Sequence, residues 1–184
     1  MRVMRQHVMQ RSAGLTMVEI VVIAVAVIAV IVILLPIWGS SSERRADSLC
    51  KANLTQLAFG FNSYANDYGG YAPHREIESS WDTLIWPYLT DETVYECPKD
   101  QWGYYLEHDS SYKWRSTAVV DPEHPERAMT GRNLIEARPR ILLLVFDASH
   151  SWHEAGYINA ATLDGDAKSV ELEEYEQDLR TRPE

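Results

Sequence analysis

Five polar residues near the C-terminus have types and spacings that could bind a divalent cation. They follow an apolar run at residues 141–146, and they are Asp147, His150, His153, Asp164 and Asp166. Carboxylate oxygens and imidazole nitrogens are donors that calcium and zinc accept, so a metal site could form where the expected strand ends. The small and polar residues between them indicate a loop, however, and the same side chains could simply bond to loop and hairpin backbone. Both interpretations stay open.

Catalysis and nucleic-acid binding are two functions that the sequence disfavours. Ser149, His150 and Ser151 offer hydroxyls beside a histidine, but no nucleophile elbow, phosphate-binding loop or HExxH pair accompanies them. The 17 Lys and Arg residues stand against 27 Asp and Glu, which gives a formal net charge of -10. A surface that binds phosphates would have to form against that field. We therefore expect neither an enzyme nor a nucleic-acid-binding protein.

The chain has two cysteines, Cys50 and Cys97. Two are too few for a disulfide-dense scaffold or a four-thiolate metal site. They form either one disulfide or two free buried thiols, and the sequence favours neither. A bridge would close a loop of about 48 residues and would stabilise the fold by roughly 4 kcal/mol in the chain-entropy description.

A long apolar segment near the N-terminus indicates a membrane helix. Residues 20–35 are sixteen consecutive apolar residues, and residues 15–19 extend the segment to 21. At about 1.5 Å per helical residue this spans roughly 30 Å, the thickness of the hydrocarbon core of a bilayer. Arg2, Arg5 and Arg11 precede it without an acidic residue, which favours an N-terminus held in the cytoplasm. We expect a transmembrane helix at 15–35 and an exported remainder.

Glu19 is the one ionisable side chain between Arg11 and Glu43. A carboxylate inside a bilayer costs about 2.5–3.5 kcal/mol at its centre, so such residues are usually paired and functional. If the chain is cut after Gly14, the new α-amine of Leu15 lies about one helical turn from Glu19, in the same chain or in a neighbouring copy. The alternative is a glutamate at the headgroup boundary that water solvates.

Residues 14–19, Gly-Leu-Thr-Met-Val-Glu, resemble the processing signal of type IV prepilins when read with the apolar run behind them and the basic leader in front. In that family a prepilin peptidase cuts after the glycine and N-methylates the next residue. Leu15 stands where the family usually has Phe. The resemblance implies a leader at 1–14, processing at Gly14 and Leu15, and a role for Glu19 in setting the register of a neighbouring subunit.

Beyond the apolar run a second helical pattern predicts packing rather than membrane insertion. Pro36 is expected to kink or loosen the helix. Apolar residues then recur at spacings of four and three, at Cys50, Leu54, Leu57, Phe61, Tyr64 and Tyr68, before Gly69 and Gly70. This single stripe predicts that residues 36–70 continue the helix outside the membrane and bury one face.

Residues 71–172 are expected to form a small α+β head. Ser80 could cap a short helix at 81–85, and Trp102, Tyr104 and Tyr105 are expected to cover a sheet rather than to bind sugars. Residues 121–140 indicate an exposed loop, and residues 141–146 a buried strand. Residues 157–163 and 167–172 flank an Asp-Gly turn, which predicts a hairpin in an antiparallel sheet. The charged tail, 173–184, is expected to be a loose helix or disordered.

The head also resembles the H-x9-DG subgroup of prepilin-type proteins. The resemblance is carried by residues 50–57, 64–68, 81, 87–89 and 97–100. The naming motif departs from the pattern by one residue, because ten residues separate His153 from Asp164 and Gly165. The resemblance to secretion pseudopilins, which use acidic loops for calcium, makes calcium the expected ion if the head binds metal. No other cofactor is expected.

Together these features predict a pilin-like α+β protein whose long N-terminal helix packs on a small antiparallel head. The expected function is that of a pseudopilin or minor pilin in a type II secretion-like or type IV pilus-like fibre. The expected partners are a prepilin peptidase, copies of itself or other pilins, and an inner-membrane assembly platform. The protein would cross the inner membrane once, with its head in the periplasm or outside, and then join an extracytoplasmic fibre. The alternative is a signal-anchored cell-surface binding module with an acidic, calcium-binding head.

Overall fold

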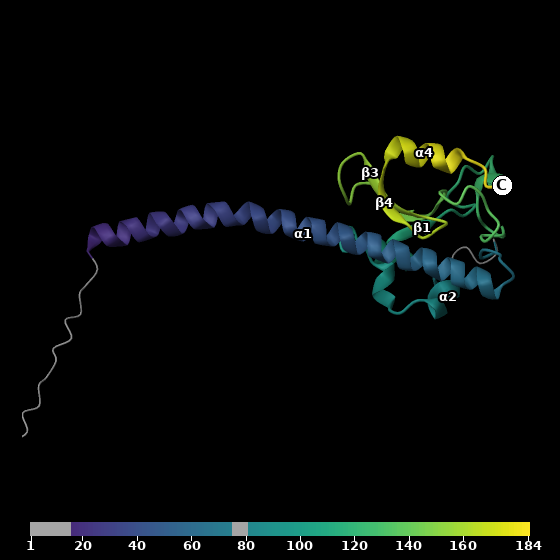
Figure 1. Ribbon diagram of the computed structural model, residues 1–184, viewed down its shortest axis with the longest axis horizontal. Coiled ribbons are helices and arrows are strands. Elements are labelled where there is room, and N and C mark those ends of the chain that lie inside the picture. Colours follow the sequence, from purple (N-terminus) through teal and green to yellow (C-terminus); the bar gives the residue numbers. More distant parts are fainter. Residues whose placement is uncertain (1–15, 75–80) are drawn as a thin grey trace, which may run out of the picture. The chain divides into compact units, whose positions relative to one another are not determined.

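The computed structural model describes residues 16–74 and 81–184 (Figure 1). The chain divides into two compact units, Met1–Ser42 and Glu43–Glu184. Helix α1 (Met17–Asp67) contributes to both units. The leader, the processing residues Gly14 and Leu15, and the expected cap Ser80 all lie outside the described residues.

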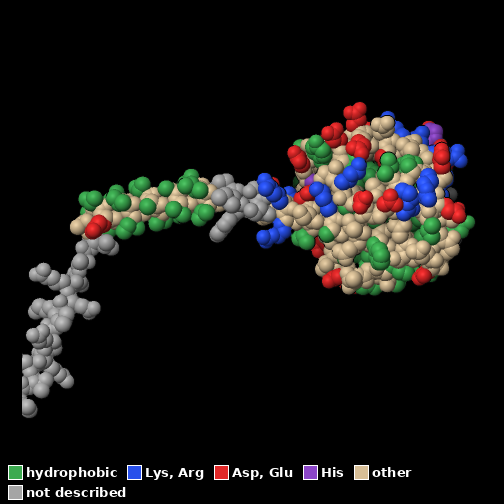
Figure 2. All heavy atoms as spheres, in the orientation of Figure 1, with side chains coloured by type: hydrophobic (Ala, Val, Ile, Leu, Met, Phe, Trp, Pro, Cys, Tyr) green, Lys and Arg blue, Asp and Glu red, His purple; other side chains and the backbone are tan. Residues whose placement is uncertain are grey.

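The described part of the first unit is apolar helix. The window Met17–Leu34 has a mean hydropathy of 3.3, and none of it is buried within the structure. Hydrophobic side chains cover the visible surface of this part (Figure 2). The helix is long and apolar enough to cross a membrane. Its assignment runs through Pro36, so the loosened turn expected there does not end it.

In the second unit the predicted apolar stripe of α1 is the centre of the main core. Cys50, Leu54, Leu57 and Phe61 are fully buried, and Tyr64 is nearly so. Tyr68 was expected to belong to the stripe, but 58% of it is exposed. The helix ends at Asp67, so Tyr68 already lies in the turn, where it stacks on Tyr64 with ring centroids 4.3 Å apart.

A four-stranded sheet completes the second unit, and it is antiparallel throughout in the order β1-β2-β3-β4. The strands are β1 (Tyr112–Trp114), β2 (Leu143–Asp147), β3 (Tyr157–Thr162) and β4 (Ala167–Glu171). Every residue of β2 is buried, as the apolar run predicted. The β3–β4 hairpin turns through Gly165, whose φ of +90° favours glycine. The predicted α+β class and antiparallel sheet are confirmed.

Short helices connect and cover the strands. They are α2 (Trp81–Ile85), η2 (Trp86–Tyr88), η3 (Glu92–Tyr95), α3 (Tyr104–His108), η4 (Pro125–Arg127) and α4 (Leu172–Arg180). The stripe of α1 packs with Trp114, Val145 and Ala161, which are paired across three strands, on one face of the sheet. Phe146, Ile158 and Val170 form a second cluster with α4. Because alternate residues of a strand face opposite ways, α1 and α4 lie on opposite faces of the sheet (Figure 1).

The tail at 173–184 was expected to be a loose helix or disordered, and most of it is an ordered helix that belongs to the fold. Helix α4 packs on the sheet, where the ring of Tyr175 meets that of Phe146 edge to face with centroids 5.0 Å apart. The fully buried guanidinium of Arg115 pairs with the carboxylate of Asp178 and also donates to the carbonyl oxygens of Asp178 and Thr181. The stripe of Leu172, Tyr175 and Leu179, at helical spacing, was hidden among charged residues.

The segment 121–140 is irregular, as expected, but it is not simply exposed. It buries four apolar residues, Ala128, Met129, Leu134 and Ala137. The N–H of Met129 donates to the carbonyl oxygen of Arg115 at 2.7 Å, which fixes the segment beside β1. Isolated apolar residues without a period of two or 3.6 gave no sequence signal of this burial.

Replacing Asp178 by alanine should lower the free energy of unfolding of the full chain by about 3 kcal/mol, because the buried Arg115 charge then lacks its carboxylate. Denaturant unfolding in detergent, followed by tryptophan fluorescence, measures this. Glu176→Ala is the control in the same helix. Its pair with Arg180 is largely exposed, so its effect should stay within about 0.5 kcal/mol. Equal effects of the two variants would show that α4 is not anchored through Arg115.

Candidate functional site

Glu19 lies in the first turn of α1 and is held by Thr16. Its Oε2 accepts hydrogen bonds from the backbone N–H of Thr16 at 2.7 Å and from the Thr16 hydroxyl at 2.8 Å. The N–H of Glu19 donates in return to the Thr16 hydroxyl oxygen at 3.3 Å. This is a capping box, in which two residues three apart satisfy each other at a helix start. The sequence pattern Thr-x-x-Glu at residues 16–19 is the signature of this motif, so Glu19 has a local partner besides any cation.

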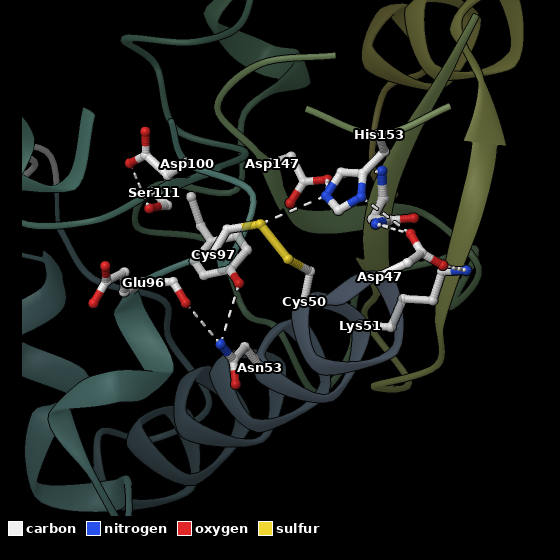
Figure 3. The surroundings of a disulfide bond; sticks show 12 residues. Asp47, Cys50, Lys51, Asn53, Glu96, Cys97, Asp100, Ser111, Asp147 and His153 are labelled. Atoms are coloured by element: carbon white, nitrogen blue, oxygen red, sulfur yellow. Dashed lines mark hydrogen bonds and ion pairs between the residues drawn. A yellow bond between two sulfur atoms is a disulfide. The ribbon is translucent and has the colours of Figure 1, made fainter. Parts of the chain in front are cut away.

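A second candidate site surrounds a disulfide between Cys50 and Cys97 (Figure 3). The two cysteines are buried and their Cα atoms lie 5.3 Å apart. Of the two alternatives left open by the sequence, the bridge is therefore the one in the structure. We call Cys50, Cys97, Asp147 and His153 the Cys–His cluster.

Four separate segments bring the cluster together. Helix α1 contributes Cys50, the turn after η3 contributes Cys97, the last position of β2 contributes Asp147, and the loop before β3 contributes His153. Asn53, one turn along α1 from Cys50, donates to the carbonyl oxygen of the residue before Cys97 at 3.0 Å. This bond and the disulfide fix the Cys97 turn against the helix.

His153 is at the centre of the cluster. Its Nε2 lies 3.1 Å from Asp147 Oδ2 and 3.6 Å from Cys97 Sγ. Its Nδ1 lies 3.1 Å from Asp47 Oδ1 on α1, although the two are not aligned as a hydrogen bond. Only 3% of the His153 side chain is exposed, and none of the Asp147 side chain. The Oδ1 atom of Asp147 is buried without a hydrogen-bond partner.

The two carboxylates beside His153 have opposite electrostatic environments. Burial raises the pKa of Asp147, and the neighbouring His153 and the N–H of Asn159 offset only part of that rise. Burial also pushes the pKa of Asp47 upward, but bonds from Lys51 and Asn159 and the charge of Lys51 outweigh it, so this pKa is lowered. Asp47 is about a third exposed and salt-bridged to Lys51 at 2.7 Å. Of the two carboxylates, it is therefore the buried one, Asp147, whose charged form the surroundings disfavour.

Asp100 holds the turn that carries Cys97. Its N–H donates to the carbonyl oxygen of Cys97 at 2.8 Å. Its carboxylate accepts four hydrogen bonds, from the N–H groups of Trp102, Tyr104 and Tyr105 and from the hydroxyl of Ser111. Burial alone would raise its pKa, but these donors outweigh burial and lower it.

Of the five residues predicted to bind metal, the structure brings together only Asp147 and His153. His150 is exposed on the loop. Asp164 pairs with Arg140 at 2.8 Å, and Asp166 is exposed in the hairpin turn. The reason is strand length. Because β3 has six residues, its two ends lie about 17 Å apart, and His153 precedes the strand while both aspartates follow it.

Of the three aromatic residues expected to cover the sheet, only two pack against the core. Trp102 is 79% exposed, whereas Tyr104 and Tyr105 are half-buried against the core. Next to the Cys–His cluster, a surface pocket of about 330 Å³ is lined by Asp47, His153 and four charged residues, Glu43, Arg44, Lys99 and Glu154, together with Ser169. The cluster is thus close to solvent at one edge, although its members are buried.

Sequence reasoning missed the association of the cysteines with Asp147 and His153, and it missed Asp47 altogether. The available signal was the spacing of Asp47 and Cys50, three residues apart on a predicted helix, which places them on one face. No sequence pattern indicated that this face of the helix contacts the loop that carries His153. Comparison of the chain with protein-family models, with curated proteins and with solved structures found no match.

Replacing Asp100 by asparagine should lower the free energy of unfolding near pH 7 by about 1 kcal/mol, because charge-assisted bonds to the turn are lost. The lowered pKa means that the charge stabilises the fold above about pH 3.8, the ordinary value, and that this stability is lost as pH falls through the folded-state pKa. The gap between the two proteins should therefore narrow on acidification.

Thermal unfolding followed by near-UV circular dichroism from pH 7 to pH 2 measures that gap. Glu107→Gln, at a largely exposed position of α3, is the control and should change little at any pH. A gap that stays constant down to pH 2 would contradict the stabilising role of the Asp100 charge.

Proposed function

We propose that this protein is a prepilin-like structural subunit, a pseudopilin or minor pilin of a type II secretion-like or type IV pilus-like fibre. The observation that carries the proposal is the start of α1. The capping box at Thr16 and Glu19 begins a helix whose window Met17–Leu34 is apolar and wholly exposed in the single chain. It follows directly on the Gly14-Leu15 signal.

The exposed apolar surface requires an environment other than water. The side chains of residues 17–34 include large exposed aliphatic groups on all sides of the helix, and each costs about 1.5–3 kcal/mol to leave in water rather than in an apolar medium. Lipid meets this requirement before assembly. In a fibre the same surface would pack against helices of neighbouring subunits, which replace lipid with similar apolar contacts.

The disulfide supports an extracytoplasmic head. Bridges persist in the periplasm and outside cells, whereas cytoplasmic thiols are kept reduced. The basic leader favours a cytoplasmic N-terminus, and the apolar helix supplies one membrane crossing. These features support insertion in the inner membrane with the head outside the cytoplasm, followed by incorporation into a fibre.

Glu19 has the geometry to serve a neighbouring subunit. The described hydrogen bonds to its carboxylate all use Oε2, which leaves Oε1 to accept from the cationic α-amine that cleavage after Gly14 creates. A carboxylate at a helix N-terminus is also stabilised by the helix dipole. A single intersubunit pair of this kind fixes the axial position of one chain against the next, because a shifted chain leaves the charge unpaired in lipid.

Mass spectrometry of the mature protein from its native membrane should show a chain that begins at Leu15 with a methylated amine. This follows from the signal at residues 14–19. Substituting Gly14 by valine should leave the leader attached and serves as the control. Recovery of the native protein with Met1 intact would instead support the signal-anchored binding module.

Replacing Glu19 by alanine should leave processing largely intact but reduce incorporation into sheared fibres at least tenfold, the effect of losing an interaction of about 1.4 kcal/mol. Glu19→Gln is the matched control for the capping box, since glutamine can also bond back to Thr16 without the charge. We expect both variants to fail in assembly. Immunoblots of fibre and membrane fractions measure this, and normal assembly of the glutamine variant would exclude the charge-pair mechanism.

A further inference from the structure

We propose that the dithiol form of the head binds one Zn²⁺ through Cys50, Cys97, Asp147 and His153. The disulfide and the zinc site would then be alternative states of the same four residues. This inference concerns the head alone and does not depend on assembly into a fibre.

The ligand atoms already lie close enough together. Each of the four residues offers one ligand atom, and these four atoms all lie within 4.8 Å of one another. They are the two cysteine sulfurs, a carboxylate oxygen of Asp147 and a ring nitrogen of His153. Bonds of about 2.0–2.3 Å to tetrahedral zinc place ligand atoms about 3.3–3.8 Å apart. Once the sulfur–sulfur bond is broken, the two sulfurs must separate to about 3.8 Å. The carboxylate oxygen and the ring nitrogen must move by about an ångström, which side-chain rotation can provide.

A second layer of residues orients the ligands as zinc sites require. His153 turns Nε2 toward Asp147 and the sulfur of Cys97, while Nδ1 faces the carboxylate of Asp47 (Figure 3). Asp47 is itself held by Lys51 at 2.7 Å and by the Asn159 side chain at 2.9 Å. A carboxylate behind a metal-binding histidine fixes the ring and strengthens its donor nitrogen.

Asp147 supplies an independent indication of a ligand. Its side chain is completely buried, its Oδ2 accepts from the N–H of Asn159 at 3.1 Å, and its Oδ1 has no hydrogen-bond partner. A purely structural disulfide has no need of a buried carboxylate with an unsatisfied oxygen, and such burial is costly. A cation held by the four cluster residues would give this carboxylate the partner that it lacks.

The donor set selects zinc over calcium. Two thiolates, one imidazole and one carboxylate make a four-coordinate set with soft ligands, whereas calcium takes six to eight oxygens. Two thiolates and the carboxylate carry three negative charges, so binding of a dication reduces the net charge of the site to −1. The pocket lined by Asp47 and His153 gives an ion access from solvent.

The exchange between the two states balances in electrons and protons. Reduction of the cystine takes two electrons and two protons and gives two thiols, and a trialkylphosphine supplies the electrons while water provides the oxygen of the phosphine oxide. Zn²⁺ then displaces both thiol protons as two zinc–sulfur bonds form. Transfer of a disulfide from a thiol oxidoreductase to the dithiol re-forms the bridge and releases Zn²⁺.

Metal content of the full chain in detergent tests the proposal. Protein reduced with a trialkylphosphine, incubated with Zn²⁺ and freed of excess ion should contain one zinc per chain, and the disulfide form should contain none. Co²⁺ in place of Zn²⁺ should give thiolate charge-transfer absorption and the intense ligand-field bands of a tetrahedral site. Zinc should also raise the Tm of the reduced chain but not that of the disulfide form, because it binds the folded dithiol.

Variants separate a built site from two cysteines that bind zinc loosely. His153→Gln and Asp147→Asn should each weaken zinc binding at least tenfold, and Asp47→Asn should weaken it by about 10–100-fold as a residue behind the ligand. His150→Gln, at an exposed position of the same loop, is the control and should bind as the parent does. Absence of zinc from the reduced parent, equal binding by the disulfide form, or unchanged affinity in both ligand variants would overturn the proposal.

Discussion

The covalent link between Cys50 and Cys97 is the interaction on which the arrangement of the head depends. It joins the buried face of α1 to a turn that Asp100 holds from the other side. His153 and Asp147 then close over the sulfurs from the sheet side. A helix, a turn and the end of a strand thus meet at one buried point. The disulfide closes a loop between residues 47 apart in sequence, and a cross-link of that span stabilises the fold by about 4 kcal/mol in the chain-entropy description.

Along α1 the same helix meets two different requirements. Apart from Glu19, residues 17–34 are apolar on every side and exposed, so the apolar side chains show no preference for one face. From Cys50 onward the buried apolar residues form a single stripe and the exposed face is mostly polar, with Phe59 as its large apolar exception, which is the pattern of a helix packed on one side. This change of pattern is what a chain needs if one part of a helix is surrounded by lipid and another part covers a sheet.

Local sequence patterns predicted the main helix and strands of the fold, but they did not predict the contacts between segments that are distant in sequence. The stripe of α1, the buried strand β2 and the Asp-Gly hairpin followed from periodicity and turn chemistry. The ion pair of Arg115 with Asp178 joins residues 63 apart in sequence, and no local pattern indicates it. The grouping of Asp164 with His153 failed for a reason that sequence could have supplied, since a six-residue strand between them carries the two apart.

The redox state of the head also links its location to its chemistry. A chain is synthesised where thiols are kept reduced and, in this proposal, functions where they are oxidised. Its four cluster residues therefore pass from a dithiol that can hold a dication to a disulfide that cannot, because a disulfide sulfur lacks the negative charge with which a thiolate binds metal. The buried carboxylate of Asp147 remains in both states. In the proposed zinc state a cation would compensate this carboxylate, whose Oδ1 has no hydrogen-bond partner in the disulfide state.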